Sequence, residues 1–160
     1  MLAAAERAIA RIPGRLASRP DEIADDAVRE SIAALNERGR GMFLVAEDAG
    51  TIVGHAHLEA LALAVTAHVV RLTIAVQEGH QGRGVGRALM NELLRWAREA
   101  PQVEKVELQV RASNDRAIAL YRSLGFVEEG RKTRRLKIGP NEYLDDVYMA
   151  LWVGVPASPG

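Results

Sequence analysis

The stretch IAVQEGHQGRGVGRALMNELLRWA, residues 74–97, decides how this chain folds. Glycine occupies positions 79, 82, 84 and 86, directly after an apolar segment that ends at Val76. The apolar residues that follow recur at the spacing of one helical face, namely Leu89, Met90, Leu93, Leu94, Trp96, Ala97 and Ala100. The stretch therefore predicts a strand over Arg71–Val76, a glycine-rich loop, and a helix over Ala88–Glu99 that ends before Pro101.

A strand, a glycine loop and a helix in this order are suited to holding a phosphate group. The backbone N–H groups at a helix start have no intrahelical partner, and the helix dipole adds partial positive charge there. Glycines allow the backbone to approach a ligand closely, and Arg83 and Arg87 add cations. Taken alone, the loop also fits an ordinary connection before an amphipathic helix.

Two common phosphate-binding motifs are excluded by the details of the loop. It lacks the Lys-Ser/Thr ending of a Walker loop, which argues against a nucleoside triphosphatase. A dinucleotide fingerprint would place its third glycine at position 87, where this chain has Arg87.

A second patterned segment follows another predicted strand, Val103–Arg111. Ser113, Asn114 and Asp115 predict a helix start, and Gly125 predicts the end of that helix. Asn114 alone fits an ordinary helix cap, and Tyr121 alone fits an aromatic residue at the edge of the core.

Together the two segments resemble the GNAT superfamily of N-acetyltransferases. The acetyl-CoA loop of that family, Gln/Arg-x-x-Gly-x-Gly/Ala, reads here as Gln81–Gly86, and its second signature reads as Asn114–Phe126. The resemblance covers about residues 41–152. It implies an α/β fold with a mixed, mostly antiparallel sheet and helices on both faces. We expect a single domain over residues 1–155 and a frayed tail over 156–160. The strand that usually opens the family is either absent or lies before the recorded start.

The resemblance also implies a site for acetyl-CoA, in the cleft where the strand ending at Val76 separates from the strand starting at Val103. Backbone groups of the first strand would bind the pantetheine arm, and the glycine loop would bind the pyrophosphate. The implied cofactor-binding residues are Ile74, Ala75, Val76, Gln81, Gly82, Arg83, Gly84, Val85, Gly86, Arg87, Asn114, Ala117 and Tyr121. The hydroxyl of Tyr121 would point at the thioester sulfur and act as a catalytic acid.

Acetyl transfer to an amine needs the neutral amine, whereas a lysine-type amine has a pKa near 10.4. A base or a water must therefore remove a proton, and a tyrosine can protonate the departing thiolate. Direct attack needs no covalent enzyme intermediate, in agreement with the absence of cysteine. Similar proteins often carry an acidic residue shortly before the position of Ile74, where this chain has Arg71 and Leu72. Glu107 is the catalytic candidate for the base, and Glu59 or a water chain are alternatives.

The acceptor is left open: an amino acid, a peptide N-terminus or a small amine. A non-catalytic acyl-CoA-binding module that lacks a base is the alternative function. Lys and Arg total 21, as do Asp and Glu, which argues against a nucleic-acid or membrane partner and mildly against a strongly acidic pocket. The strands near the C-terminus are compatible with a homodimer.

Several kinds of site and location are not expected. The chain has no cysteine, no signal-peptide pattern and no apolar run long enough to span a membrane, so we expect a cytoplasmic protein. His55 and His57 share a strand face but lack a third ligand, so no metal site is expected. The basic run Arg131–Lys137 fits either exposed strand positions or a basic rim near the cofactor phosphates or an acidic partner.

The remaining elements follow from local patterns. A helix is expected over Leu2–Ile12, stopped by Pro13-Gly14, and another from about Pro20 to Gly39. The other expected strands are Phe43–Glu47, Thr51–Glu59, Phe126–Ile138 and Tyr143–Val153, the last two joined by a turn at Gly139–Glu142.

Overall fold

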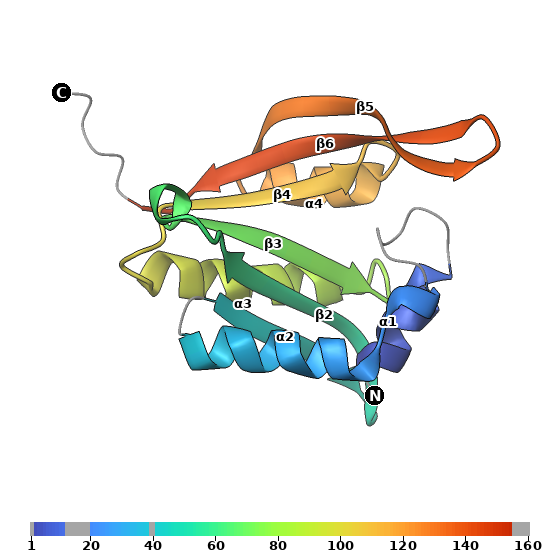
Figure 1. Cartoon of the computed structure of the whole chain (residues 1–160), viewed down its shortest axis with the longest axis horizontal. Coiled ribbons are helices and arrows are strands. Elements are labelled where there is room, and N and C mark those ends of the chain that lie inside the picture. The colour runs from blue at the N-terminus through green and yellow to red at the C-terminus, as the bar shows by residue number, and fades with distance from the viewer. Residues whose placement is uncertain (1, 12–19, 39–40, 155–160) are drawn as a thin grey trace.

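The computed structural model describes residues 2–11, 20–38 and 41–154, which form an α/β domain built on one six-stranded open sheet (Figure 1). The helices are α1 (Leu2–Ala10), α2 (Asp25–Arg38), α3 (Val85–Glu99) and α4 (Asp115–Ser123), with short 3₁₀ turns η1 (Pro20–Glu22) and η2 (Ala64–Thr66). The strands are β1 (Gly41–Asp48), β2 (Thr51–Ala60), β3 (Val69–Val76), β4 (Lys105–Arg111), β5 (Val127–Gly139) and β6 (Glu142–Trp152).

The strand order is β1-β2-β3-β4-β6-β5, and every neighbouring pair is antiparallel except β3 and β4. The parallel pair is short: only Val69–Arg71 face Lys105–Glu107. Beyond these residues the two strands separate, as Figure 1 shows near the middle of the sheet. In this sheet, therefore, residues 72–76 of β3 pair with β2 on one side and with no strand on the other.

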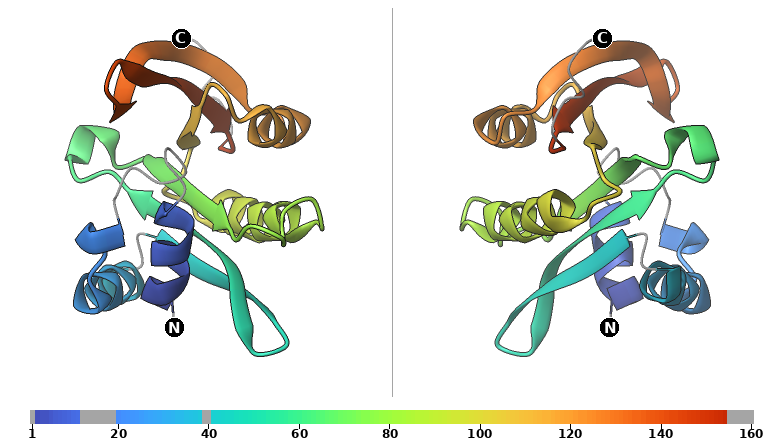
Figure 2. Two further views of the ribbon diagram at one scale, coloured as in Figure 1. Left: turned by 90° about the vertical axis from the view of Figure 1, so that its right-hand side faces the viewer. Right: turned by 90° about the vertical axis from the view of Figure 1, so that its left-hand side faces the viewer.

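Helices cover both faces of the sheet (Figure 2). α3 and α4 lie on one face, and α1 and α2 lie on the other, where α2 packs on β1 and α1 on β2. The alternation along β2 divides its side chains between them: Ala56 and Leu58 are fully buried toward α3, and His55 contacts α1. We call the face that carries α1 and α2 the front face.

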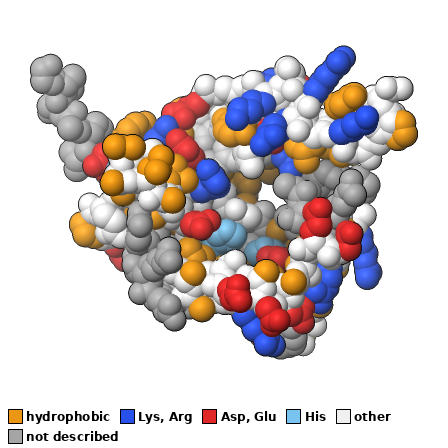
Figure 3. Space-filling view, in the orientation of Figure 1, with side chains coloured by type: hydrophobic (Ala, Val, Ile, Leu, Met, Phe, Trp, Pro, Cys, Tyr) orange, Lys and Arg blue, Asp and Glu red, His pale blue; other side chains and the backbone are white. Residues whose placement is uncertain are grey.

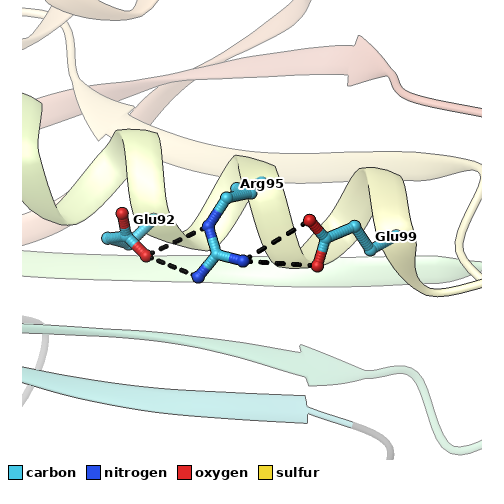
Figure 4. Close-up of polar contacts among 3 residues, drawn as sticks. All are labelled: Glu92, Arg95 and Glu99. Atoms are coloured by element: carbon cyan, nitrogen blue, oxygen red, sulfur yellow. Dashed lines mark hydrogen bonds and ion pairs between the residues drawn. The ribbon is translucent and has the colours of Figure 1, made fainter.

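α3 is held to the sheet by the apolar stripe that the sequence predicts. Its buried residues are Leu89, Met90, Leu93, Leu94 and Ala97. The opposite side is charged: the Arg95 guanidinium lies between the carboxylates of Glu92 and Glu99, at 2.8 Å and 3.3 Å (Figure 4). Ion pairs at these spacings support an exposed helix face only weakly, because solvent screens them.

Most predicted elements are present, with shifted ends. The helix after the glycine loop begins at Val85, three residues before the predicted Ala88, so residues 85–87 form its first turn. β4 begins at Lys105 instead of Val103. The predicted stops at Pro13-Gly14 and Gly39, and the tail at 156–160, lie outside the described residues.

The predicted turn at Gly139–Glu142 joins β5 to β6, and Asn141 adopts a left-handed φ of 62° there. The basic run on β5 is exposed, which agrees with the first of the two interpretations. Arg131 pairs with Asp145 at 2.9 Å, and the Lys132 ammonium lies 4.5 Å from the ring centre of Tyr148. None of these basic residues lines the cavity described below, so they form no rim around a phosphate there.

Candidate active site

A cavity of about 430 Å³ lies beside the end of β3, between the glycine loop, the start of α3 and α4. It is lined by residues from five segments: Ile9, Ile74, Ala75, Val76, Gln81, Gly82, Gly84, Gly86, Arg87, Asn114, Arg116, Ala117, Ala119, Leu120, Tyr121 and Ser123. We call it the fork cavity. It brings together most of the residues that the sequence assigns to cofactor binding.

The first wall of the fork cavity is the unpaired edge of β3. Residues 74–76 line it, and on the side away from β2 they have no strand partner, so their outward backbone groups other than the Val76 carbonyl can bind a ligand. Gln81 fixes the loop against this strand, because its Nε2 donates to the carbonyl of Val76 at 3.1 Å. The side chain of Gln77 donates to the carbonyl of Ile52 at 2.8 Å and anchors the loop to β2.

The second wall is the start of α3. Gly84 precedes the helix in a left-handed conformation, with φ of 86°, and the space where its side chain would be is open. No side chain caps this helix end, so its first N–H groups are available to an anion. Gly86 lies close to α4, since a β-carbon there would be 3.6 Å from Leu120 Cδ2.

Two arginines from different helices add positive charge at this wall. The guanidinium of Arg116, on α4, would lie 3.4 Å from a β-carbon at Gly82. Arg87, on α3, donates to the hydroxyl of Ser123 at 3.1 Å. Uncapped N–H groups, open glycine backbone and two guanidinium groups fit a pyrophosphate.

α4 supplies the third wall. The Asn114 side chain caps this helix by accepting a hydrogen bond from the N–H of Ala117 at 3.2 Å. Tyr121, one turn after Ala117, is 6% exposed and lines the cavity, with its ring 5.9 Å from that of Phe126. Burial raises the pKa of Tyr121 to about 12. The phenol is therefore protonated throughout the neutral range and can donate a proton.

Three residues assigned to the site from the sequence do not line the fork cavity: Arg83, Val85 and Glu107. Arg83 is exposed on the loop, and Val85 packs against β2, 3.3 Å from where a β-carbon on Gly54 would lie. Sequence reasoning missed Ile9, Arg116, Ala119, Leu120 and Ser123. Four of these residues lie on α4, and their closeness in sequence to Asn114 and Tyr121 could have indicated that they line the cavity. Nothing in the sequence around Ile9 indicates that it does.

Glu107 stands on β4 at the last residue pair before β3 and β4 separate, opposite Arg71. Its carboxylate accepts from the Lys105 ammonium at 3.0 Å, and Lys105 also binds Glu129 at 2.9 Å. Burial by itself lowers the pKa of Lys105, but the hydrogen bonds to Glu129 and Glu107 outweigh burial and raise that pKa.

A second cavity, of about 630 Å³, opens on the front face. It is lined by Glu6, Glu22, Ile23, Ala24, Ala27, Val28, Glu30, Ser31, Ala34, Leu35, Phe43, His57, Glu59, Ala60 and Ala62. We call it the front cavity. Its lining comes from α1, η1, α2, β1 and β2, so it forms only when these segments meet.

Stacked side-chain rings on β1 and β2 lie at the front cavity. The Phe43 ring is parallel to those of His55 and His57, with centroids 5.9 Å and 5.4 Å away. His55 Nε2 lies 3.1 Å from a carboxylate oxygen of Glu6. Burial and the neighbouring imidazole of His55 lower the pKa of His57, against the raising effect of the carboxylates of Glu59 and Glu6.

The part of the chain that the structure describes contains no group of three or more His, Cys, Asp or Glu side chains placed to hold a metal ion. Within the same ranges, no helix combines the length and the apolar character needed to cross a membrane.

Comparisons with known proteins agree on one family. Residues 8–126 match the sequence model of the acetyltransferase (GNAT) family. The chain is 40% identical over 96 residues to N-alpha-acetyltransferase RimI of Mycobacterium tuberculosis, a match covering 60% of this chain and 58% of that protein. It is 34% identical over 107 residues to L-amino acid N-acetyltransferase AaaT of Escherichia coli, covering 67% of this chain and 65% of that one. The chain thus matches about three fifths of the length of these relatives.

Solved structures agree with the sequence comparisons. The structure of yncA of Salmonella typhimurium, described as a putative acetyltransferase with its cofactor acetyl-CoA, is 25% identical and superposes with a TM-score of 0.76. That match covers 88% of this chain and 80% of the other.

Proposed function

We propose, since this chain belongs to the GNAT family of acetyltransferases, that it acetylates a primary amine of an amino acid, a peptide N-terminus or a small molecule by direct attack on acetyl-CoA. Membership of the family and the named relatives support acetyl transfer from acetyl-CoA as the activity. The class of acceptor and the roles of single residues are further parts of the proposal.

The observation that carries the proposal is the composition of the fork cavity. It combines an unpaired strand edge, an uncapped helix start and a buried, protonated phenol within one space. The edge over Ile74–Val76 is suited to hydrogen-bonding an extended amide chain, and the start of α3 is suited to a pyrophosphate. Pantetheine and pyrophosphate are the corresponding parts of coenzyme A. Arg87 and Arg116 would pair with its phosphates.

We propose Tyr121 as the acid. When the acceptor nitrogen bonds to the acetyl carbon and the carbon–sulfur bond breaks, the sulfur leaves as a thiolate. A phenol whose pKa is raised to about 12 is fully protonated before this step, so its hydroxyl would hydrogen-bond the sulfur as negative charge develops there and pass its proton to the thiolate as it leaves.

We propose Glu107 as the acceptor, through a water, of the proton that the amine loses. Its Cα pairs with Arg71 at the point where β3 and β4 separate. Glu107 shares the front face of the sheet with Gln109 and Arg111, since Val106, Leu108 and Val110 point to the buried side. Its ion pair with Lys105 holds the carboxylate in place. Replacing Glu107 with Gln should slow acetylation most at neutral pH and least at alkaline pH, where the acceptor amine is already neutral.

Thiol release from acetyl-CoA tests the function. The acceptor panel holds the amino acids, short peptides with different N-termini, and small mono- and polyamines, between neutral and mildly alkaline pH. Acceptor-dependent release supports the proposal. Absence of release with every pool, in a protein that acetyl-CoA still protects against melting, would contradict it and favour a module that only binds acyl-CoA.

A further inference from the structure

We infer that the front cavity binds the acceptor and selects amines that carry a second positive charge, such as linear diamines, over acceptors that carry a carboxylate. This inference rests on the proposed function, because it names the class of amine that the same active site would acetylate.

The two cavities are neighbours on α1. Glu6 lines the front cavity and Ile9 lines the fork cavity, three residues apart and so on the same side of the helix. They are also neighbours across the sheet: His57 of the front cavity pairs with Thr73, which precedes Ile74 of the fork cavity. An acceptor in the front cavity would therefore lie close to the thioester end of a bound acetyl-CoA.

The charged side chains that line the front cavity are acidic. Four glutamates contribute, and no Lys or Arg occurs among the described residues of the lining. Glu30 and Glu59 make no ion pair within the described part of the chain, and Glu6 faces His55. Arg71 on β3 is the strand partner of Glu59, but the two side chains form no ion pair, and Arg71 does not line the cavity.

Figure 3 shows this face hollowed near its centre, with histidine side chains in the hollow and acidic side chains beside it. The shift of the His57 pKa agrees with this arrangement, since Glu59 and Glu6 are close enough to act on it. The rest of the lining is largely apolar, with Ile23, Val28 and Leu35 from the α2 side. Carboxylates around an apolar lining match a ligand with cationic ends and an aliphatic middle.

The expected selection between acceptors follows from the attraction of opposite charges and the repulsion of like charges. A second ammonium group near one or two partly exposed carboxylates gains about 1 kcal/mol, which is roughly a fivefold effect on binding. A carboxylate at the same position is repelled. Both amines of a linear diamine are protonated at neutral pH, because alkyl amines have pKa values near 10.4.

The test compares three acceptors of one length: a five-carbon linear diamine, the five-carbon monoamine, and the five-carbon amino acid whose far end is a carboxylate. With full-length protein and saturating acetyl-CoA, kcat/KM should fall in that order, by about fivefold or more at each step. Equal values for the diamine and the amino acid, or a preference for the amino acid, would overturn the inference.

Variants locate the effect. Glu59→Gln and Glu30→Gln should each lower the ratio of kcat/KM for the diamine to kcat/KM for the monoamine by about two- to fivefold, through KM for the diamine. Glu47→Gln is the matched control, because Glu47 is an exposed carboxylate of the same sheet outside both cavities. An equal loss with Glu47→Gln, or none with either cavity variant, would contradict the assignment.

Calorimetry separates this inference from the proposed function. The diamine and the amino acid are titrated into protein saturated with coenzyme A, which allows binding without transfer. Tighter binding of the diamine supports the charge selection even if thiol is never released, in which case only the proposed function fails. Equal or weaker binding of the diamine overturns the charge selection even if thiol release is observed.

Discussion

Arg116 and Gly82 meet although they lie on different segments, with a guanidinium nitrogen 3.4 Å from where a β-carbon on the glycine would be. The missing side chain thus leaves room for a cation from α4 beside the loop that we assign to the pyrophosphate. Arg116→Gln should weaken acetyl-CoA binding by about five- to thirtyfold, the effect of losing one charge-assisted phosphate contact. Calorimetric titration with acetyl-CoA measures this, and Arg98→Gln, an exposed change near the far end of α3, should have no effect.

Gly84→Glu should remove acetyl-CoA binding from the fork cavity. The substitution places a carboxylate in the open space before the start of α3, where the pyrophosphate is expected. Because the φ of Gly84 is 86°, the variant also carries backbone strain of about 1–2 kcal/mol.

Gly50→Glu is the control for Gly84→Glu. Gly50 has a φ of 79° and equally open surroundings, but it lies in the turn between β1 and β2. Both variants should lose similar stability in thermal melts, and only Gly84→Glu should lose protection by acetyl-CoA. Protection of Gly84→Glu equal to that of the parent protein would refute the cofactor placement.

Tyr121→Phe should lower kcat by about 10²–10⁴-fold while acetyl-CoA affinity stays within about twofold, since the hydroxyl acts only when the sulfur leaves. The pKa near 12 implies that loss of the phenol proton does not limit the parent enzyme below about pH 10. Tyr143→Phe, on the β5–β6 hairpin, should behave like the parent. An unchanged kcat in Tyr121→Phe would exclude this tyrosine from the chemistry.

The lowered pKa of His57 predicts loss of stability in mild acid. The unfolded chain takes up a proton near pH 6.5, whereas the folded chain takes it up only at lower pH, so stability falls as the pH drops below about 6.5. His57→Gln removes this linkage. The melting temperature of the parent should therefore fall more than that of His57→Gln between pH 7.5 and pH 5.5, and parallel decreases would show that His57 does not contribute.

Asp146→Asn should be strongly destabilising. Asp146 is 1% exposed and forms an ion pair with Arg111 across β4 and β6. Asparagine removes the charge that pairs with Arg111 in a buried setting, so a charge-assisted hydrogen bond is lost, at a cost of about 1.5–3 kcal/mol in the free energy of unfolding. The neighbouring Asp145 pairs with Arg131 at the surface, so Asp145→Asn should have a far smaller effect in the same denaturant titration.

The features that could be predicted from the sequence are those set by residues within one segment. The glycines at 82 and 84 and the apolar spacing of α3 are consequences of backbone geometry within one segment, and the strand and helix that they predict are present. The start of α3 was placed three residues late, because Val85 and Gly86 read as loop residues. The helix there follows a left-handed Gly84 that the sequence could not reveal.

Features that need distant segments were not predicted. The charge of the whole chain is zero, yet the front cavity gathers Glu6, Glu30 and Glu59 from α1, α2 and β2. The pairing of Arg111 with Asp146 depends on the register of β4 and β6, which no local pattern specifies. Arg116 reaches Gly82 only because α4 lies beside the glycine loop.

The separation of β3 from β4 has a mechanical consequence. The two halves of the sheet are joined only by the three residue pairs between Val69–Arg71 and Lys105–Glu107. The β3–β4 pairing is therefore the shortest strand pairing in the sheet. A bound thioester that hydrogen-bonds along residues 74–76 would stabilise the sheet where β3 has no strand partner, for as long as it stays bound. The enzyme would then be stiffest when loaded for reaction and loosest after its product has left.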